Sequence, residues 1–142
     1  MSDLRRLVGK VAVVTGAAQG LGEALAHRLG REGADVVVLD INAAQAQAVA
    51  DQVAAQHGVR TMAAAADVTD CAATEAVFAR AAEVMGQVDI AVSNAGILFA
   101  GAVDEIDPAR WQKVIDVNLV GYFHVARAAA RVMKPRKSGV II

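Results

Sequence analysis

The stretch KVAVVTGAAQGLG, residues 10–22, decides the fold of this chain. Its first six residues form a β-branched apolar run that predicts a buried strand. Glycines follow at positions 16, 20 and 22, and apolar residues with helical spacing continue at positions 21, 24, 25, 26 and 29. A buried strand that enters an amphipathic helix through a glycine-rich turn is typical of the first βα unit of a parallel sheet.

The same alternation continues along the chain. Further strands are predicted at 35–40, 61–67, 88–93 and 138–142, and further helices at 42–56, 70–85 and from 107 to about 133. Segment 61–67 is rich in alanine, which favours helix, but its place in the alternation indicates a strand. Asp70 and Asp107, the latter followed by Pro108, are expected N-caps. We therefore expect one domain over residues 1–142, a Rossmann-type doubly wound parallel sheet in three α/β/α layers that stops in its fifth strand.

The composition excludes several classes of function. The chain has 142 residues, of which 56% are hydrophobic, and a net charge of −1, which gives no reason to expect binding to nucleic acid or an anionic membrane surface. The single cysteine, Cys71, and three scattered histidines show no metal-ligand spacing, so no metal is expected. The N-terminus has no apolar core of a secretory signal, and no apolar run is long enough to span a membrane. The expected setting is cytoplasmic.

The glycine turn is a candidate phosphate-binding loop. Gly16 would allow the tight turn, Gly20 would let the backbone approach a pyrophosphate, and Gly22 would let the helix lie against the sheet. The phosphates would sit on the free N–H groups and the positive dipole end of the helix, so Gln19 and Leu21 belong to the same expected site. The alternative is an ordinary strand–helix turn with convenient glycines.

Asp40 ends the second predicted strand, 24 residues after Gly16. A carboxylate at this distance can accept hydrogen bonds from the adenosine ribose, although it could instead cap the next helix. A 2′-phosphate beside it would be repelled by roughly 4 kcal/mol per unit charge at ~4 Å and an effective dielectric constant of ~20. No Arg or Lys lies at positions 16–22 or 41–43 to offset that repulsion, so the expected cofactor is NAD and not NADP.

The order of the motifs resembles the short-chain dehydrogenase/reductase family over essentially the whole chain. The spacing Gly-x-x-x-Gly-x-Gly is similar to the cofactor loop of that family, and Asp40 to the acidic residue of its NAD-preferring members. Asp67-Val68 resembles its adenine-contacting pair, and Asn118 its active-site asparagine. Asn94-Ala95-Gly96 resembles its Asn-Asn-Ala-Gly motif, with Ser93 in place of the first asparagine.

The resemblance also implies what this chain lacks. The family's catalytic Ser and Tyr-x-x-x-Lys follow the fifth strand and are expected beyond Ile142. Tyr122 is the only tyrosine, and the residue four positions later is Ala126 and not lysine, so we interpret Tyr122 as a packing residue. The resemblance implies that Asn118 disturbs its helix so that a carbonyl holds a water of the proton relay. The alternative is a core asparagine bonded to the backbone.

The expected function is hydride transfer between NAD and the carbinol or carbonyl carbon of an alcohol or ketone, with this chain carrying the cofactor-binding part and inactive alone. The stretches SNAGIL and VIDVNLVGYFHVAR resemble the family's polyol and sugar-alcohol-phosphate dehydrogenases, notably sorbitol-6-phosphate 2-dehydrogenase. The resemblance also implies a homodimer or homotetramer. Alternatives are a 3-oxoacyl-type reductase, a non-catalytic NAD-binding module and a methyltransferase, against which the later motifs argue.

Overall fold

The computed structural model describes residues 5–142, so the expectations for residues 1–4 lie outside the described residues. Five parallel strands form one sheet in the order β3-β2-β1-β4-β5, and the predicted doubly wound sheet is confirmed. The alanine-rich segment is a strand, as its place in the alternation indicates. The strands are β1 (Val11–Thr15), β2 (Asp35–Asp40), β3 (Thr61–Ala65), β4 (Ile90–Val92) and β5 (Val140–Ile141).

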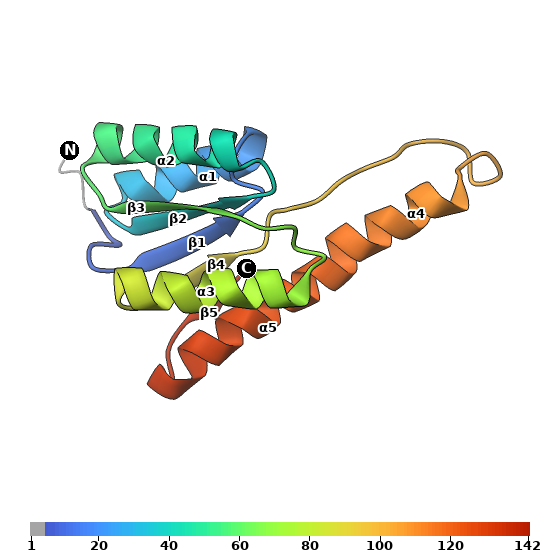
Figure 1. Cartoon of the computed structure of the whole chain (residues 1–142). Helices are drawn as coiled ribbons and strands as arrows, with labels where there is room; N and C mark the ends of the chain where they lie inside the picture. The colour runs from blue at the N-terminus through green and yellow to red at the C-terminus, as the bar shows by residue number, and fades with distance from the viewer. Residues whose placement is uncertain (1–4) are drawn as a thin grey trace.

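Helices cover both faces of the sheet (Figure 1). The helices α1 (Gly20–Arg31) and α2 (Ala43–His57) lie on one face, and α3 (Cys71–Met85) and α5 (Gly121–Met133) lie on the other. The chain proceeds outward from β1 to β2 and β3, and then returns to place β4 on the other side of β1. The strand order therefore reverses between β1 and β4, and crevices at such a reversal, beyond the carboxyl ends of the strands, bind ligands in this class of sheet.

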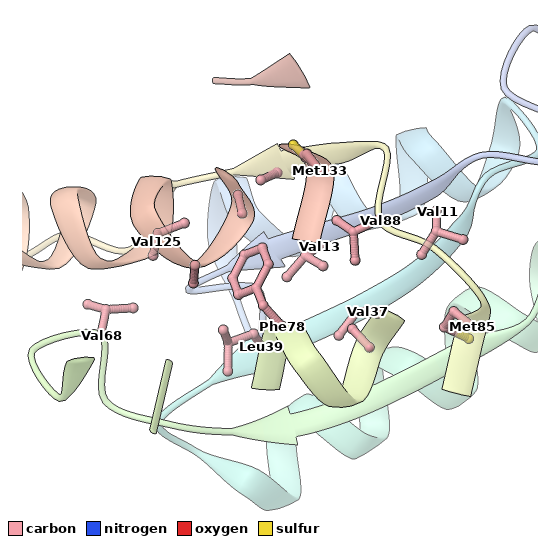
Figure 2. Packing of buried hydrophobic residues seen from close by; sticks show 14 residues of the cluster. Val11, Val13, Val37, Leu39, Val68, Phe78, Met85, Val88, Val125 and Met133 are labelled. Carbon is pink, nitrogen blue, oxygen red and sulfur yellow. The ribbon is translucent and has the colours of Figure 1, made fainter. Parts of the chain in front are cut away.

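The central strands are apolar on both sides because both faces of the sheet are covered. Phe78 of α3 is fully buried and packs in one cluster with Val13 and Leu39 from the sheet and Val125 from α5 (Figure 2). The alternate strand residues enter a second cluster beneath α1 and α2, formed by Val14, Val36, Val38 and their helical neighbours. Successive side chains of a strand point to opposite faces of the sheet, so neighbouring residues contribute to different helical layers.

Helix α1 packs on the sheet through small residues. Its buried residues are Gly22, Ala26 and Gly30, whereas Leu21 is 79% exposed. The helical spacing predicted from the apolar residues is correct, but the largest of them do not all face the core. At Gly22 the helix lies against loop backbone, and a Cβ on Gly30 would lie 2.8 Å from Val53 Cγ1, so larger side chains do not fit at these two positions.

The long helix predicted from 107 to 133 is present in extent but is not regular. It consists of α4 (Pro108–Ile115), a π-helical turn η1 (Asp116–Val120) and α5, and a 3-10 turn η2 (Lys134–Arg136) follows. In the π turn the N–H of Gly121 donates to the carbonyl of Asp116, five residues earlier. The turn changes the phase of the helix, so the side chains before and after it do not share one continuous face.

The predicted N-caps are confirmed. The side chain of Asp70 accepts from the N–H of Ala73 at the start of α3, and Asp107 accepts from Ala109 at the start of α4. Figure 1 shows α4 and the loop before it extending away from the layered body, and none of the residues of α4 is buried. Within residues 5–142, no helix combines the length and the apolar character needed to cross a membrane.

Candidate functional site

The glycine loop after β1 is packed so closely that two of its glycines have no room for a side chain. Gly16 has a φ of +61°, and a Cβ there would lie 2.8 Å from the Cα of Ala95. A Cβ on Gly22 would overlap the carbonyl oxygen of Gly16 and come within 2.6 Å of Asn94 Nδ2. These contacts bring the first turn of α1 against the loops that follow β1 and β4. Gly22 was expected to let the helix approach the sheet, and its contacts are with these loops at the end of the sheet.

Gly20 differs from these two glycines because its surroundings are open. It has a φ of +58°, and no atom lies within 4 Å of a Cβ built on it. Left-handed backbone favours glycine for conformational reasons, whatever the available space. The open space beside Gly20, at the first residue of α1, is therefore available to a ligand that approaches the backbone closely.

The N-terminus of α1 lacks a side-chain cap. Gln19 occupies the N-cap position and is exposed, but its side chain accepts no hydrogen bond from the first turn. By contrast, α2, α3 and α4 begin with side-chain caps from Asn42, Asp70 and Asp107. The first N–H groups of α1 are thus left for an acceptor other than a cap, and the positive end of the helix dipole favours an anion there.

Thr15, which our sequence reasoning missed, joins the carboxyl ends of β1 and β4. It is fully buried, and its Oγ1 accepts hydrogen bonds from the N–H groups of Asn94 and Ala95, both at 3.0 Å. The same hydroxyl donates to the carbonyl of Val92 at 3.4 Å. In the sequence, the only signal was a polar residue at the end of an apolar strand.

Asn94 completes this connection in the opposite direction. Its Nδ2 donates to the carbonyl oxygens of Thr15 at 3.1 Å and Gly16 at 3.2 Å. Backbone groups of the glycine loop and of the loop after β4 are therefore held together by two side chains. The predicted residues Gly16, Asn94 and Ala95 lie together at one edge of the sheet.

Asp40 ends β2 beside the glycine loop. Its Oδ2 accepts from the N–H of Ala18 at 3.0 Å, and its Oδ1 accepts from the N–H of Asn42 at 3.0 Å. The alternative that Asp40 caps the next helix is wrong, because the side chain of Asn42 provides that cap by accepting from Gln45. A carboxylate offers about four acceptor positions, so Asp40 retains capacity for a ligand's hydroxyl groups.

Asp67 and Val68 form a tight turn after β3, next to Asp40. The N–H of Asp70 donates to the carbonyl of Asp67 at 2.9 Å, and Asp67 Oδ1 accepts from both the N–H and the hydroxyl of Thr69. Val68 is 6% exposed, and its carbonyl accepts a hydrogen bond from His124 Nδ1 at 2.9 Å. Beside this turn lies an open pocket of about 300 Å³ lined by Asp67, Thr69, Lys113, Asp116, Val117 and Val120.

Asn118 lies in the π turn and faces the loop after β4. Its Oδ1 accepts from the N–H of Ile97 at 2.8 Å, and its Nδ2 donates to the carbonyl of Ile97 at 2.9 Å. A Cβ on Gly96 would lie 3.4 Å from Asn118 Oδ1. The helix disturbance expected at Asn118 is present. The alternative of a core asparagine bonded to the backbone is right about the backbone hydrogen bonds and wrong about the core position, since the residue is exposed.

The interpretation of Tyr122 as a packing residue is wrong for this structure. The side chain is 46% exposed on α5, because the buried residues of that helix are Gly121, Val125, Ala128, Ala129 and Met133. No lysine follows at the required spacing, so the structure supplies no cation in register with this phenol.

Two histidines that are far apart in sequence meet between α1 and α2. His27 Nδ1 lies 3.2 Å from His57 Nε2, and the rings are edge to face. Burial, and then the neighbouring His27, lower the pKa of His57. Among residues 5–142, no group of three or more His, Cys, Asp or Glu side chains is arranged to hold a metal ion.

Known proteins share both the sequence and the fold. A family model described as short chain dehydrogenase matches residues 10–142. The chain is 37% identical over 140 residues to 2,3-dihydro-2,3-dihydroxybenzoate dehydrogenase of Bacillus subtilis, covering 99% of this chain and 53% of that protein. It is 43% identical over 145 residues to versicolorin reductase 1 of Aspergillus parasiticus, covering 100% of this chain and 53% of that protein.

Two solved structures extend the comparison. A short-chain type dehydrogenase/reductase from Mycobacterium marinum superposes with a TM-score of 0.92 at 35% identity, over 99% of this chain and 58% of the other. An NAD⁺-bound xylitol dehydrogenase gives a TM-score of 0.92 at 31% identity, and the match covers 96% of this chain and 52% of the other. The chain thus spans about half the length of the curated relatives it matches. The sequence match, the parallel sheet and the arrangement of its glycine loop show that this chain belongs to the short-chain dehydrogenase family of oxidoreductases.

Proposed function

We propose that this chain is the NAD-binding part of an oxidoreductase that acts on an alcohol or ketone. The observation that carries the proposal is the uncapped N-terminus of α1 beside the open, left-handed Gly20. A dinucleotide pyrophosphate would accept hydrogen bonds from the N–H groups there, with Gly16, Gln19, Gly20, Leu21 and Gly22 as its binding residues.

The ribose of adenosine would be held by Asp40. The carboxylate is anchored by Ala18 and Asn42 and keeps spare acceptor capacity, as hydroxyl groups of a ribose require. A 2′-phosphate at this place would meet a negative charge, and no Arg or Lys occurs at 16–22 or 41–43 to compensate it. We therefore propose NAD as the cofactor.

The adenine ring would lie at the turn after β3, against Asp67 and Val68. Asp67 Oδ1 is engaged by Thr69, but neither Asp67 Oδ2 nor the N–H of Val68 makes a hydrogen bond to any of residues 5–142. A free acceptor next to a free donor matches the N6 amino group and N1 of adenine. The remaining proposed contacts, Asn94, Ala95 and Gly96, would face the nicotinamide half.

The nicotinamide, when bound, supplies the hydride acceptor or donor. In the proposed mechanism Asn118 fixes the loop after β4 and contributes to proton relay, while Ser and Tyr-x-x-x-Lys from outside residues 1–142 orient the substrate oxygen and exchange its proton. A polyol or sugar-alcohol phosphate is the first substrate to test. Support comes from the resemblance of residues 93–98 and 114–127 to polyol dehydrogenases and from the similarity to a xylitol dehydrogenase.

We also propose a homodimer or homotetramer in the cytoplasm for the whole protein. Large apolar side chains on the outer side of α4, η1 and α5 support the assembly, namely Trp111, Leu119, Tyr122 and Phe123.

Calorimetric titration of the chain with NAD, NADP and S-adenosylmethionine tests the proposal. Saturable binding of NAD, with weaker binding of NADP and none of S-adenosylmethionine, is expected. Binding of S-adenosylmethionine and of neither dinucleotide would favour the methyltransferase alternative and overturn the proposed dehydrogenase function. NAD-linked oxidation of polyols by the chain and by any longer form then separates a catalyst from a binding module.

A further inference from the structure

We propose that His124 is a positioning residue for the adenine end of the cofactor site. It holds the carbonyl of Val68 and thereby fixes the turn whose free donor and acceptor select adenine. This inference rests on the proposed NAD site and adds to it a residue from a distant helix, 56 positions along the chain from Val68.

The hydrogen bond between the two residues has a defined direction. His124 Nδ1 lies 2.9 Å from the carbonyl oxygen of Val68. A carbonyl oxygen can only accept, so Nδ1 must carry the proton, and the neutral ring is the Nδ1–H tautomer. Val68 as a whole is 6% exposed, and His124 is the hydrogen-bond partner that its carbonyl has among residues 5–142.

A second contact from the same helix holds the other side of Val68. Gly121 lies one turn before His124, and a Cβ on it would come within 2.7 Å of Val68 Cγ2. Residues at this spacing share one face of a helix. The backbone at Gly121 therefore packs against the side chain of Val68, and the imidazole of His124 donates a hydrogen bond to its carbonyl. The π turn immediately before Gly121 sets the phase that brings this face of α5 to the turn.

The groups left free by these contacts form a recognition pair. Val68 keeps an unpaired N–H, and Asp67 keeps an unpaired Oδ2, among residues 5–142. Adenine presents an acceptor at N1 and a donor at N6, whereas hypoxanthine presents a donor at N1 and an acceptor at O6. A turn held in this conformation accepts the first pattern and opposes the second. Without His124, the Val68 carbonyl would lose this partner. The Val68–Thr69 peptide, whose N–H donates to Asp67 Oδ1, would then be held less firmly, and the pair would lose its alignment.

The test compares affinities for NAD and for nicotinamide hypoxanthine dinucleotide, which differ only in this edge of the base. Calorimetry on the chain should show NAD preferred by about tenfold, the effect of roughly one well-placed hydrogen bond. His124→Leu keeps the bulk of the side chain without a donor and should reduce the preference to within about twofold. His124→Asn places an amide nitrogen near the position of Nδ1 and should restore most of it, whereas His124→Gln should not.

A loss of packing alone would weaken the binding of both dinucleotides equally and leave the ratio of their affinities unchanged. Arg127→Leu provides the control, because it removes an α5 contact with Glu75 of α3 and no hydrogen bond to Asp67 or Val68. It should lower stability without changing the ratio. If His124→Leu does not fold, the comparison of the Asn and Gln variants gives the same answer.

Each outcome is informative. A wild-type preference that survives unchanged in His124→Leu, or that Asn fails to restore, overturns the role of His124 while leaving NAD binding intact. Equal wild-type affinities overturn the adenine assignment of the turn. A chain that binds neither dinucleotide overturns the proposed function itself, together with this inference.

Discussion

Asn118 forms a closed pair of hydrogen bonds with the backbone of Ile97, accepting from its N–H at 2.8 Å and donating to its carbonyl at 2.9 Å. One side chain thus connects the π turn to the loop after β4. Because both the N–H and the carbonyl of Ile97 are bonded to Asn118, the loop is held at Ile97 before it extends toward α4. The proposed nicotinamide side of the site is the region stabilised by this contact.

Asn118→Ala should therefore release the loop with a modest effect on the whole fold. We expect amide exchange at Ile97 and the following loop residues to increase at least tenfold, with a loss of about 1 kcal/mol in unfolding free energy. Asn42→Ala is the matched control, since it removes an N-cap of similar value from α2. Faster exchange of the loop in both variants would show that Asn118 has no local role.

Thr15→Val should destabilise the fold by about 2 kcal/mol, because two partly buried N–H groups lose their acceptor while the shape is retained. Thr15→Ser should recover most of the loss. Urea unfolding of the three proteins measures it. Thr74→Val is a suitable comparison, since Thr74 is equally buried but its hydroxyl only donates to a carbonyl that already accepts from a backbone N–H. Equal losses of unfolding free energy in Thr15→Val and Thr74→Val would contradict a special role for the hydrogen bonds of Thr15 with Asn94 and Ala95.

Gly20→Val should abolish measurable NAD binding while the fold is largely kept. The substitution costs about 1–2 kcal/mol for a left-handed backbone, and its branched side chain enters the open space where the pyrophosphate is proposed. Gly58→Val is the control, because Gly58 also has a positive φ and no neighbour within 4 Å, but it ends α2 far from the loop. Circular dichroism and calorimetry distinguish the two. NAD affinity retained in Gly20→Val would remove the pyrophosphate from this loop.

Asp40→Ala should narrow the preference for NAD over NADP by about tenfold, since the carboxylate that opposes a 2′-phosphate is removed. Some loss of stability is also expected, because the N–H groups of Ala18 and Asn42 lose their acceptor. Paired titrations with the two cofactors give the ratio. Asp35→Ala removes a carboxylate from the opposite end of the same strand, where it binds Arg60, and should leave the ratio unaltered.

Stability should depend on the pH through Glu32. The hydrogen bonds from Arg6 hold the pKa of this carboxyl at about 2 in the folded chain, compared with its ordinary value of 4.5. A depressed pKa gives stabilisation that is fully present above about pH 4.5 and is lost as the pH falls through about 2. Arg6→Gln should reduce the change in the midpoint of thermal unfolding between these two pH values. A profile identical to that of the wild type would assign the acid sensitivity to other groups.

Much of the fold was predictable because it depends on local pattern. The β-branched runs at β1 and β2 are buried on both faces, and the caps Asp70 and Asp107 act on N–H groups only a few residues away. The alanine-rich β3 was predictable only from its place in the alternation, since its own composition favours helix. Of the site, Gly16 and Gly22 followed from the need for close backbone approach at a strand–helix turn.

The sequence by itself therefore determined the order of elements, the parallel sheet and the edge at which the candidate site lies, because hydrophobic period and glycine placement are local properties. Tertiary structure alone decided the contacts of Thr15 with Asn94 and of Val68 with His124, and the exposure of Leu21 and Tyr122. These features join residues many positions apart or depend on which face of a helix meets the sheet. Such choices arise only when the layers pack, because each buried polar group must then find a partner and each close contact must accommodate a side chain.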